Sequence, residues 1–322
     1  MLLNLVEYHW AEHIDDVLLL LARLDIKTVP LAGGTYLLGL QDDTISAVAD
    51  LRELDLSYIT EDAQGIHIGA MTTLQDIVDA PLLKELAAGL LSSAAQTSAS
   101  SRLIRNSATI GGTLAVGAAS QADLLTALVA LDAEVVVRSA SKTQVNLSAG
   151  TAERPGLGLS GVVYKGKQER RISSGSFSTE KRPNELIVEV VVPRLSYSCG
   201  ASFQRIGRMP TDVALLNAVA VVEIEDGVYR RVRLTFGGVN MEPMRVHAVE
   251  QQLEGQTAIH PNDGQRLLSV LKAGMAEFHP SSDALVSSGY RRVSGMSLAY
   301  QVLEEAIKVS HWRSVMSSRE SR

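Results

Sequence analysis

The sequence predicts an α/β fold for the first half of the chain and an α+β fold for the last third. In the first half, apolar residues at helical spacing alternate with short stretches rich in β-branched residues. In the last third, two apolar stretches joined by Asp226-Gly227, a favourable hairpin turn, precede a run of helical patterns. Two loops that contain Gly-Gly-Thr interrupt the α/β part. Together these observations predict the fold class.

Each element of the first half follows from its own pattern. Residues 15–24 carry Val17, Leu18, Leu20, Leu21 and Leu24 at helical spacing and predict a helix. A strand over residues 27–31 then leads into the first glycine loop. The later elements are expected at 36–40 (helix-like), 47–51 (strand), 66–68 (strand), 82–99 (helix), 123–131 (helix) and 134–138 (strand).

The last third is expected to contain strands followed by helices. These strands are expected at 218–224 and 232–237, and the helices at 245–253, 264–277 and 289–309; an earlier strand is expected at 186–192. The tail after Trp312 is polar, and we expect it to fray.

Composition limits the possible classes of function. The net charge of −6 offers no basic surface for nucleic acid. A single cysteine, Cys199, excludes an intrachain disulfide and an iron–sulfur cluster held by this chain alone. No apolar stretch is long enough to cross a bilayer, and no signal-peptide pattern opens the sequence. We therefore expect a cytoplasmic protein.

The two glycine loops are the strongest functional signal. The first reads Ala32-Gly33-Gly34-Thr35-Tyr36, and the second reads Thr109-Ile110-Gly111-Gly112-Thr113. Glycine pairs permit positive φ angles and close backbone approach, so consecutive N–H groups can converge on an anion. The threonine hydroxyls add further donors. Two such loops predict a clamp that holds a pyrophosphate from two sides.

With these loops, the chain resembles the FAD-binding medium subunits of the molybdenum hydroxylases, the xanthine dehydrogenase and carbon monoxide dehydrogenase group. The resemblance rests on Ala-Gly-Gly-Thr in the first loop, Thr-Ile-Gly-Gly in the second and Asp123 downstream. It extends over residues 5–305, with further matches at Ile68–Thr73, Asn184–Ile187, Phe203–Asp212, Pro280–Asp283 and Tyr290-Arg291.

The resemblance implies an FAD-binding fold of the vanillyl-alcohol-oxidase-like type. Its expected parts are two α/β subdomains (1–57 and 58–178), an α+β C-terminal subdomain (179–310) and a polar tail (311–322). Relatives usually have a shorter connection between residues 139 and 183, so we expect an inserted loop near Arg154–Ser176. That loop contains no cysteine for the extra iron–sulfur cluster carried by one branch of the family.

The same resemblance assigns roles to site residues. Backbone N–H groups of both loops would hold the FAD pyrophosphate, and Asp123 would fix the cofactor near its ribose and phosphates. Leu186 matches a position near the isoalloxazine ring, and Arg205 or its neighbour Gln204 matches a cationic one. Thr113 replaces the usual Asn, and Tyr36 replaces a small polar residue, which puts FAD affinity and flavin tuning in question.

The implied function is electron transfer within an oxidoreductase complex. A large molybdopterin subunit would oxidise the substrate, and a small subunit with two [2Fe–2S] clusters would deliver electrons to this FAD. An external acceptor would then receive them, and no residue of this chain is expected to act as an acid or base or to bind a metal. A dimer of heterotrimers is the expected assembly. The alternatives are a self-sufficient FAD oxidoreductase and a non-catalytic assembly subunit with decayed loops.

Three other motifs and the single cysteine favour structural interpretations. The GxGxxG at residues 156–161 follows a proline and precedes β-prone residues, so we expect a loop. Residues 161–167 resemble a phosphate-binding loop, but Gln168 stands where Ser or Thr would bind magnesium. His9 and His13 fit HxxEH, yet no third zinc ligand is identifiable, and Cys199 is expected to be a packing residue.

Overall fold

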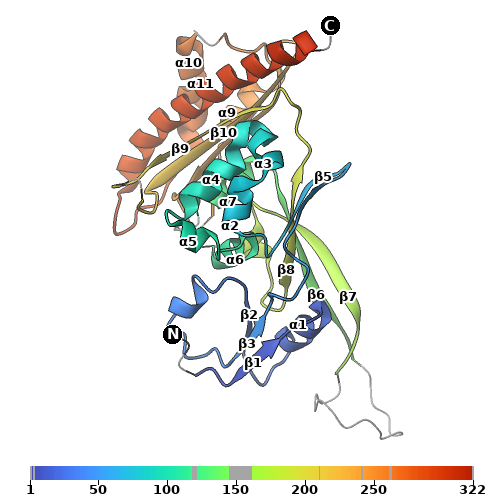
Figure 1. Ribbon diagram of the computed structural model, residues 1–322. Coiled ribbons are helices and arrows are strands. Elements are labelled where there is room, and N and C mark those ends of the chain that lie inside the picture. The colour runs from blue at the N-terminus through green and yellow to red at the C-terminus, as the bar shows by residue number, and fades with distance from the viewer. Residues whose placement is uncertain are drawn as a thin grey trace, which may run out of the picture.

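The computed structural model describes residues 2, 4–117, 122–144, 162–209, 211–240, 242–260 and 263–320. Three β-sheets follow one another, from the N-terminal sheet at the bottom of Figure 1 to the C-terminal sheet at the top. Three clusters of buried apolar residues fill the spaces between the sheets and helices. The predicted combination of α/β and α+β parts is confirmed.

The N-terminal sheet is parallel, with strand order β1-β3-β2. Its elements are β1 (Glu7–Trp10), α1 (Ile14–Leu21), β2 (Thr28–Leu31), the 3-10 helix η1 (Leu37–Gly39) and β3 (Ala47–Asp50). Val17 and Leu18 of α1 pack with Ala49 in a core that also contains residues of the central sheet. This shared core fixes the carboxyl ends of β2 and β3, where the first glycine loop begins.

The central sheet has five strands in the order β4-β5-β8-β6-β7, paired in antiparallel fashion. The strands are β4 (Ile59–Glu61), β5 (Gly65–Gly69), β6 (Glu134–Gln144), β7 (Val162–Ser173) and β8 (Leu186–Pro193). The helices of this part are α2 (Leu74–Asp79), α3 (Pro81–Glu85), η2 (Leu86–Gly89), α4 (Leu90–Ser98), α5 (Arg102–Arg105), α6 (Ile110–Val116), α7 (Ala122–Ala130) and α8 (Phe177–Glu180). Ile66 and Ile68 of β5 pack with Leu124 and Leu128 of α7 in the largest core cluster.

The position of β7 beside β6 corrects one expectation, and the position of β8 between β5 and β6 bears on a domain boundary. Residues 162–173, which we expected within an inserted loop, form β7 and pair along β6; the loop prediction is therefore wrong for them. Cross-strand ion pairs explain the charged sequence, since Arg138 contacts Glu169 at 2.8 Å. β8 pairs with β5 and β6, so a boundary at residue 178 would cut this sheet. We infer that the boundary lies between β8 and β9, while the other boundaries stay predictions.

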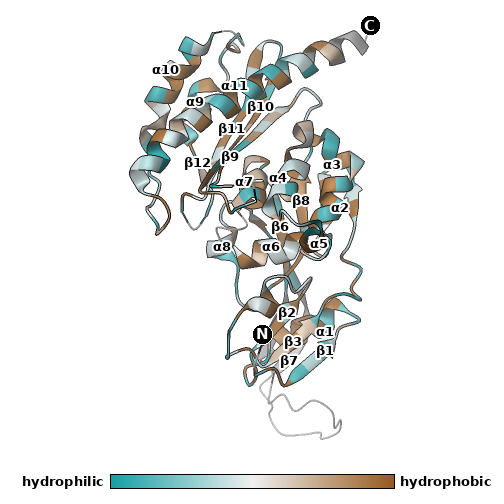
Figure 2. Ribbon diagram, turned by 60° about the vertical axis from the view of Figure 1, so that its left-hand side comes forward, coloured by the Kyte–Doolittle hydropathy of each residue, from teal (hydrophilic) through white to brown (hydrophobic). Residues whose placement is uncertain are grey.

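The C-terminal sheet has the order β12-β11-β10-β9 and is covered on both faces. Its strands are β9 (Gly200–Ile206), β10 (Leu216–Glu225), β11 (Val228–Gly237) and β12 (Met244–Arg245). Its helices are α9 (His247–Leu253), α10 (Gly264–Gly274), η4 (Met275–Glu277) and α11 (Ser288–Glu320). Val219 and Val221 pack against the central helices, while Ala220 and Val222 face α9 and α11. The middle of β10, residues 218–222, is accordingly apolar, whereas Asn217, Glu223 and Glu225 are polar, and in Figure 2 this sheet carries both brown and teal stretches.

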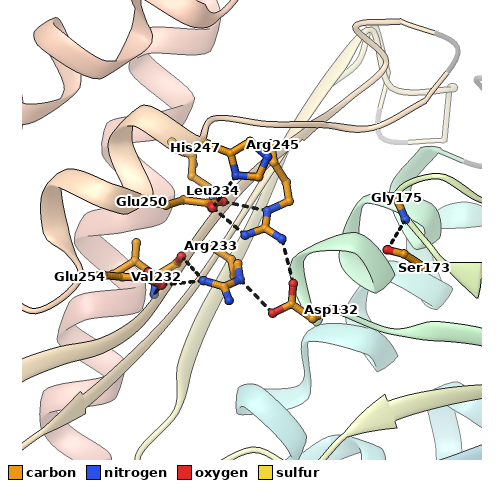
Figure 3. Close-up of polar contacts among 10 residues, drawn as sticks. All are labelled: Asp132, Ser173, Gly175, Val232, Arg233, Leu234, Arg245, His247, Glu250 and Glu254. Carbon is orange, nitrogen blue, oxygen red and sulfur yellow. Dashed lines mark hydrogen bonds and ion pairs between the residues drawn. The ribbon is translucent and has the colours of Figure 1, made fainter.

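Two arginines of this sheet anchor it to the end of α7 (Figure 3). Asp132 accepts a hydrogen bond from Arg233 at 2.8 Å and from Arg245 at 2.9 Å. Arg233 also reaches Glu254, and Arg245 reaches Glu250, both at 2.6 Å. A single carboxylate thus joins the central part to the C-terminal sheet through two paired guanidinium groups.

Two helix predictions are wrong in part. The helix expected over residues 82–99 is broken, because Ala87 and Ala88 adopt left-handed φ angles of 44° and 57°. The tail after Trp312 continues as a helix through Glu320. At the start of this extension, Arg313 is buried and donates to the carbonyl oxygens of Cys199 and Glu85.

Candidate functional site

The two glycine loops lie in direct contact. The first follows β2 at the carboxyl end of a parallel strand, and Gly34 adopts a positive φ of 70°. The second leads into α6, whose Thr109 side chain caps the helix by accepting from the Gly112 N–H at 3.0 Å. A Cβ atom on Gly33 would lie 1.6 Å from the Ser107 carbonyl oxygen. Only glycine permits this approach.

The loops differ in how their backbone donors are used. Among the described residues, the N–H groups of Gly33, Gly34, Thr35 and Tyr36 find no hydrogen-bond acceptor. In the second loop, the Ile110 and Gly111 N–H groups donate to Thr72 and Ala70 carbonyl oxygens at 3.0 and 2.9 Å. Gly112 and Thr113 donate to Thr109. The first loop therefore offers backbone donors, whereas the second offers mainly the hydroxyls of its threonines.

Two adjoining cavities lie along this contact. The larger, about 370 Å³, is lined by both loops, including Ala32, Gly33, Gly34, Thr35, Tyr36, Thr109, Gly112 and Thr113. The smaller, about 110 Å³, is lined by Gly111, Gly112, Leu186, Lys181 and several apolar residues. Pro30, Ala32, Gly112 and Ala115 line both. Burial lowers the pKa of Lys181 despite the nearby Glu185 carboxylate.

A third cavity, of about 230 Å³, adjoins the first loop on the side of the C-terminal sheet. Thr35 and Tyr36 line it together with Asp123 and Arg205. The Arg205 Nε atom lies 3.3 Å from Asp123 Oδ2, and both side chains are largely buried. Leu186 and Arg205 are both expected near the isoalloxazine ring. In the structure, Arg205 lines this third cavity, whereas Leu186 lines the cavity of about 110 Å³.

Ile110 takes a different place from the other loop residues. Its side chain is fully buried in the central core and lines none of these cavities. It supports the second loop by packing, and its backbone ties the loop to Thr72.

Sequence reasoning missed a polar cluster on the other side of the first loop. Tyr8, Asp50 and Arg52 line a cavity of about 580 Å³ that Gly33 and Gly34 also border. Burial opposes ionisation of Asp50, but hydrogen bonds from Arg52 and Tyr8 outweigh it and lower the pKa of that carboxyl. The sequence signal for this cluster was Asp50, a carboxylate that ends the otherwise apolar strand β3.

The other motifs have structural roles wherever the structure describes them. His9 lies in β1 and His13 precedes α1, so they do not share a helix face. Residues 162–167 belong to β7, and the GxGxxG at 156–161 lies outside the described residues. Cys199 is fully buried, which raises its pKa to about 12. Among the described residues, no group of His, Cys, Asp or Glu could hold a metal.

The residues at the loops fit a dinucleotide. Free N–H groups beside a positive-φ glycine suit a pyrophosphate, and apolar residues such as Pro30 and Met71 suit aromatic rings. No helix in the described part of the chain has the length and apolarity that a membrane crossing requires. The fold and the site are thus those expected of a dinucleotide-binding protein.

Comparisons with known proteins identify the family. Residues 4–151 match the FAD binding domain in molybdopterin dehydrogenase, and residues 201–306 match the CO dehydrogenase flavoprotein C-terminal domain. The glyceraldehyde dehydrogenase medium chain of Sulfolobus acidocaldarius is 27% identical over 289 residues, covering 88% of this chain and 92% of that one. The 6-hydroxypseudooxynicotine dehydrogenase complex subunit alpha of Paenarthrobacter nicotinovorans is 30% identical over 256 residues, 78% of each chain.

The fold agrees with a solved structure as well. A chain of carbon monoxide dehydrogenase from Hydrogenophaga pseudoflava, in a form lacking the Mo-pyranopterin moiety, superposes with a TM-score of 0.77. It is 23% identical and covers 96% of this chain and 99% of its own. The chain belongs to the FAD-binding medium subunits of the molybdenum hydroxylases. It is therefore the FAD-binding subunit of an oxidoreductase, as its sequence predicted.

Proposed function

We propose that this chain is the electron-transfer subunit of a molybdopterin and iron–sulfur dehydrogenase. In that complex, [2Fe–2S] clusters of a small subunit would supply electrons, and an external acceptor would remove them. A bound flavin accepts electrons singly and donates them singly or in pairs. The observation that carries the proposal is the first glycine loop, whose unused N–H groups border a cavity shared with the second loop.

The cavities suggest which residues hold each part of FAD. We expect the N–H groups of residues 33–36 and the Thr109 and Thr113 hydroxyls to bind the pyrophosphate. The isoalloxazine end would lie beside Arg205, whose charge stabilises an anionic ring. The apolar cavity at Leu186 would then receive the adenine end, which revises its expected place beside the isoalloxazine.

This arrangement also bears on the alternatives. A self-sufficient oxidoreductase needs a substrate site with groups that move protons. Among the described residues, each carboxylate that lines the cavities around the loops is instead held in an ion pair with an arginine or a lysine. Decayed loops would not retain a contact as close as that between Gly33 and Ser107. We therefore propose partners of two kinds, a large molybdopterin subunit and a small iron–sulfur subunit, in a dimer of heterotrimers in the cytoplasm.

The first test is the visible absorption spectrum of the purified chain, followed by chromatography of the cofactor released by heat. Near-stoichiometric FAD is the expected result. A protein that stays colourless after incubation with FAD would overturn the proposal. Electron transfer is then tested by mixing the FAD-loaded chain with reduced iron–sulfur subunit and following flavin bleaching, with FAD-free chain as the control.

A further inference from the structure

Three neighbouring strands of the C-terminal sheet place a row of residues against α7. Asn217 in β10 is directly opposite Arg205 in β9 and opposite Gly237 in β11. On the facing helix, Asp123 and Thr126 are three residues apart and therefore share one face. The row and the helix face meet at the junction between the central part and the C-terminal sheet.

A continuous polar chain runs through this junction. The Thr126 hydroxyl lies 2.9 Å from Asn217 Oδ1, and Asn217 Nδ2 donates to Asp123 Oδ1 at 2.5 Å. The other carboxylate oxygen of Asp123 lies 3.3 Å from Arg205 Nε. Arg205 also donates to the Asp212 carbonyl oxygen, which belongs to the same cavity wall.

Glycine at position 237 makes room for this chain. A Cβ atom there would lie 2.0 Å from Thr126 Oγ1 and 2.4 Å from Asn217 Oδ1. Thr126 and Asn217 are fully buried, and Asp123 is 4% exposed. A carboxylate buried to this degree needs both of its oxygens satisfied. Asn217 donates a hydrogen bond to one of them, and Arg205 forms an ion pair with the other.

We propose that Asn217 is a positioning residue that acts through Asp123 to hold the Arg205 guanidinium at the wall of the flavin cavity. The inference rests on the proposed function, because it places the isoalloxazine end of FAD in the cavity that Arg205 and Tyr36 line. Asn217 itself does not line that cavity. It therefore adjusts the flavin environment from the C-terminal sheet, although the glycine clamp belongs to the first two parts of the chain.

The test compares Asn217→Leu, which removes the donor, with the wild-type chain. FAD is titrated into apoprotein, and the flavin midpoint potential is measured on the loaded protein. We expect FAD to bind about tenfold more weakly, the ratio for loss of one charged contact between the displaced Arg205 guanidinium and the flavin. The midpoint potential should become more negative, because Arg205 is no longer fixed beside the ring. In an Arg205→Gln background, Asn217→Leu should shift the potential no further.

Asn217→Asp provides a second variant of the same shape, should the leucine variant fail to fold. It places a second carboxyl group against Asp123, and we expect at least the same loss of FAD affinity. Thr235→Val is the control, since Thr235 is fully buried in β11 and its hydroxyl has no partner among the described residues. That control should retain wild-type affinity and potential.

The outcomes separate this inference from the proposed function. A wild-type chain that binds no FAD overturns both. If the wild type binds FAD and the Asn217 variants keep its affinity and midpoint potential, the positioning role is wrong, whatever their melting temperatures. An equal shift of potential in the Arg205→Gln background would likewise show that Asn217 does not act through Arg205.

Discussion

Gly33 packs so closely against the carbonyl oxygen of Ser107 that a Cβ atom at position 33 would have no room. This contact joins the loop after β2 to the loop before α6, although about 70 residues separate them in sequence. The two loops therefore form one surface, and the free N–H groups of the first border the cavity that the second closes. Any change that separates the loops should affect cofactor binding before it affects the cores.

Gly33→Ala is expected to abolish tight FAD binding. The added methyl group would lie 1.6 Å from a backbone oxygen, and the loops must separate to accept it. Overpacking of this kind costs about 1–3 kcal/mol in stability. Gly39→Ala is the matched control, because no atom lies within 4 Å of its Cβ position. FAD titration and urea unfolding of both variants check the prediction, which fails if Gly33→Ala binds FAD as the wild type does.

Asp132→Asn should weaken the junction between the central part and the C-terminal sheet. The amide retains the shape and tolerates the left-handed φ of 54°, but Arg233 and Arg245 lose their shared charge partner. Since both arginines are about four-fifths buried, we expect a loss of about 2 kcal/mol in the free energy of unfolding.

Arg230→Gln is the control for that variant. Its ion pair with Glu225 is solvent-exposed, and such pairs contribute about 0–1 kcal/mol. Denaturant unfolding of the two variants measures the difference. Equal stability losses would show that Asp132 adds no more than a surface pair does.

The arrangement of the site agrees in part with the glycine pattern of the sequence. The first Gly-Gly-Thr loop borders a cavity, and Asp123 and Arg205 line a common one. The FAD contacts of these residues stay a prediction. The sequence could not show that N–H groups of the second loop are already hydrogen-bonded within the protein. Their acceptors are the carbonyl oxygens of Ala70 and Thr72, which lie about 40 residues earlier in the chain.

The fold was harder to predict where tertiary contacts override local preference. Charges in β7 suggest a loop, yet Glu169 and Arg171 pair with residues of β6 across the sheet. Alanine favours helices, but Ala87 and Ala88 turn the chain between α3 and α4. Apolar runs without such conflicts, such as β8 and β10, were predicted well.

The pair formed by Asp283 and Arg291 should contribute acid sensitivity. The Arg291 guanidinium and the N–H groups of Leu285 and Val286 lower the pKa of Asp283 to about 2. A carboxyl whose pKa is lower in the folded state stabilises it above about pH 4 and loses this effect as the pH falls toward 2. Arg291 is buried and also donates to Leu215 and Ser281 carbonyl oxygens.

Asp283→Asn tests this contribution. Urea unfolding at a series of pH values should show the variant less stable than the wild type at neutral pH. The difference should shrink below about pH 4, because the wild-type carboxyl then becomes neutral as well. Asp55→Asn, at an exposed position between β3 and β4, shows how an exposed acid elsewhere behaves. A stability difference that stays constant from neutral pH to pH 2 would contradict the role of Asp283.

Ala88→Gly should stabilise the chain. Ala88 is exposed and has φ 57° and ψ 32°, a left-handed conformation that costs an L-residue about 1–2 kcal/mol. Glycine adopts this conformation without that cost, but it loses more conformational entropy on folding, so we expect a net gain of about 0.5–1 kcal/mol.

The matched control for Ala88→Gly is Ala273→Gly, at an exposed position within the right-handed helix α10. There the same substitution should destabilise the chain by about 1 kcal/mol, because glycine is a poor helix former. Opposite signs in the two unfolding free energies would establish that the α3–α4 connection is left-handed in solution. If both variants lose stability equally, Ala88 lies in a right-handed helical turn. The helix expected over residues 82–99 would then be continuous at this position.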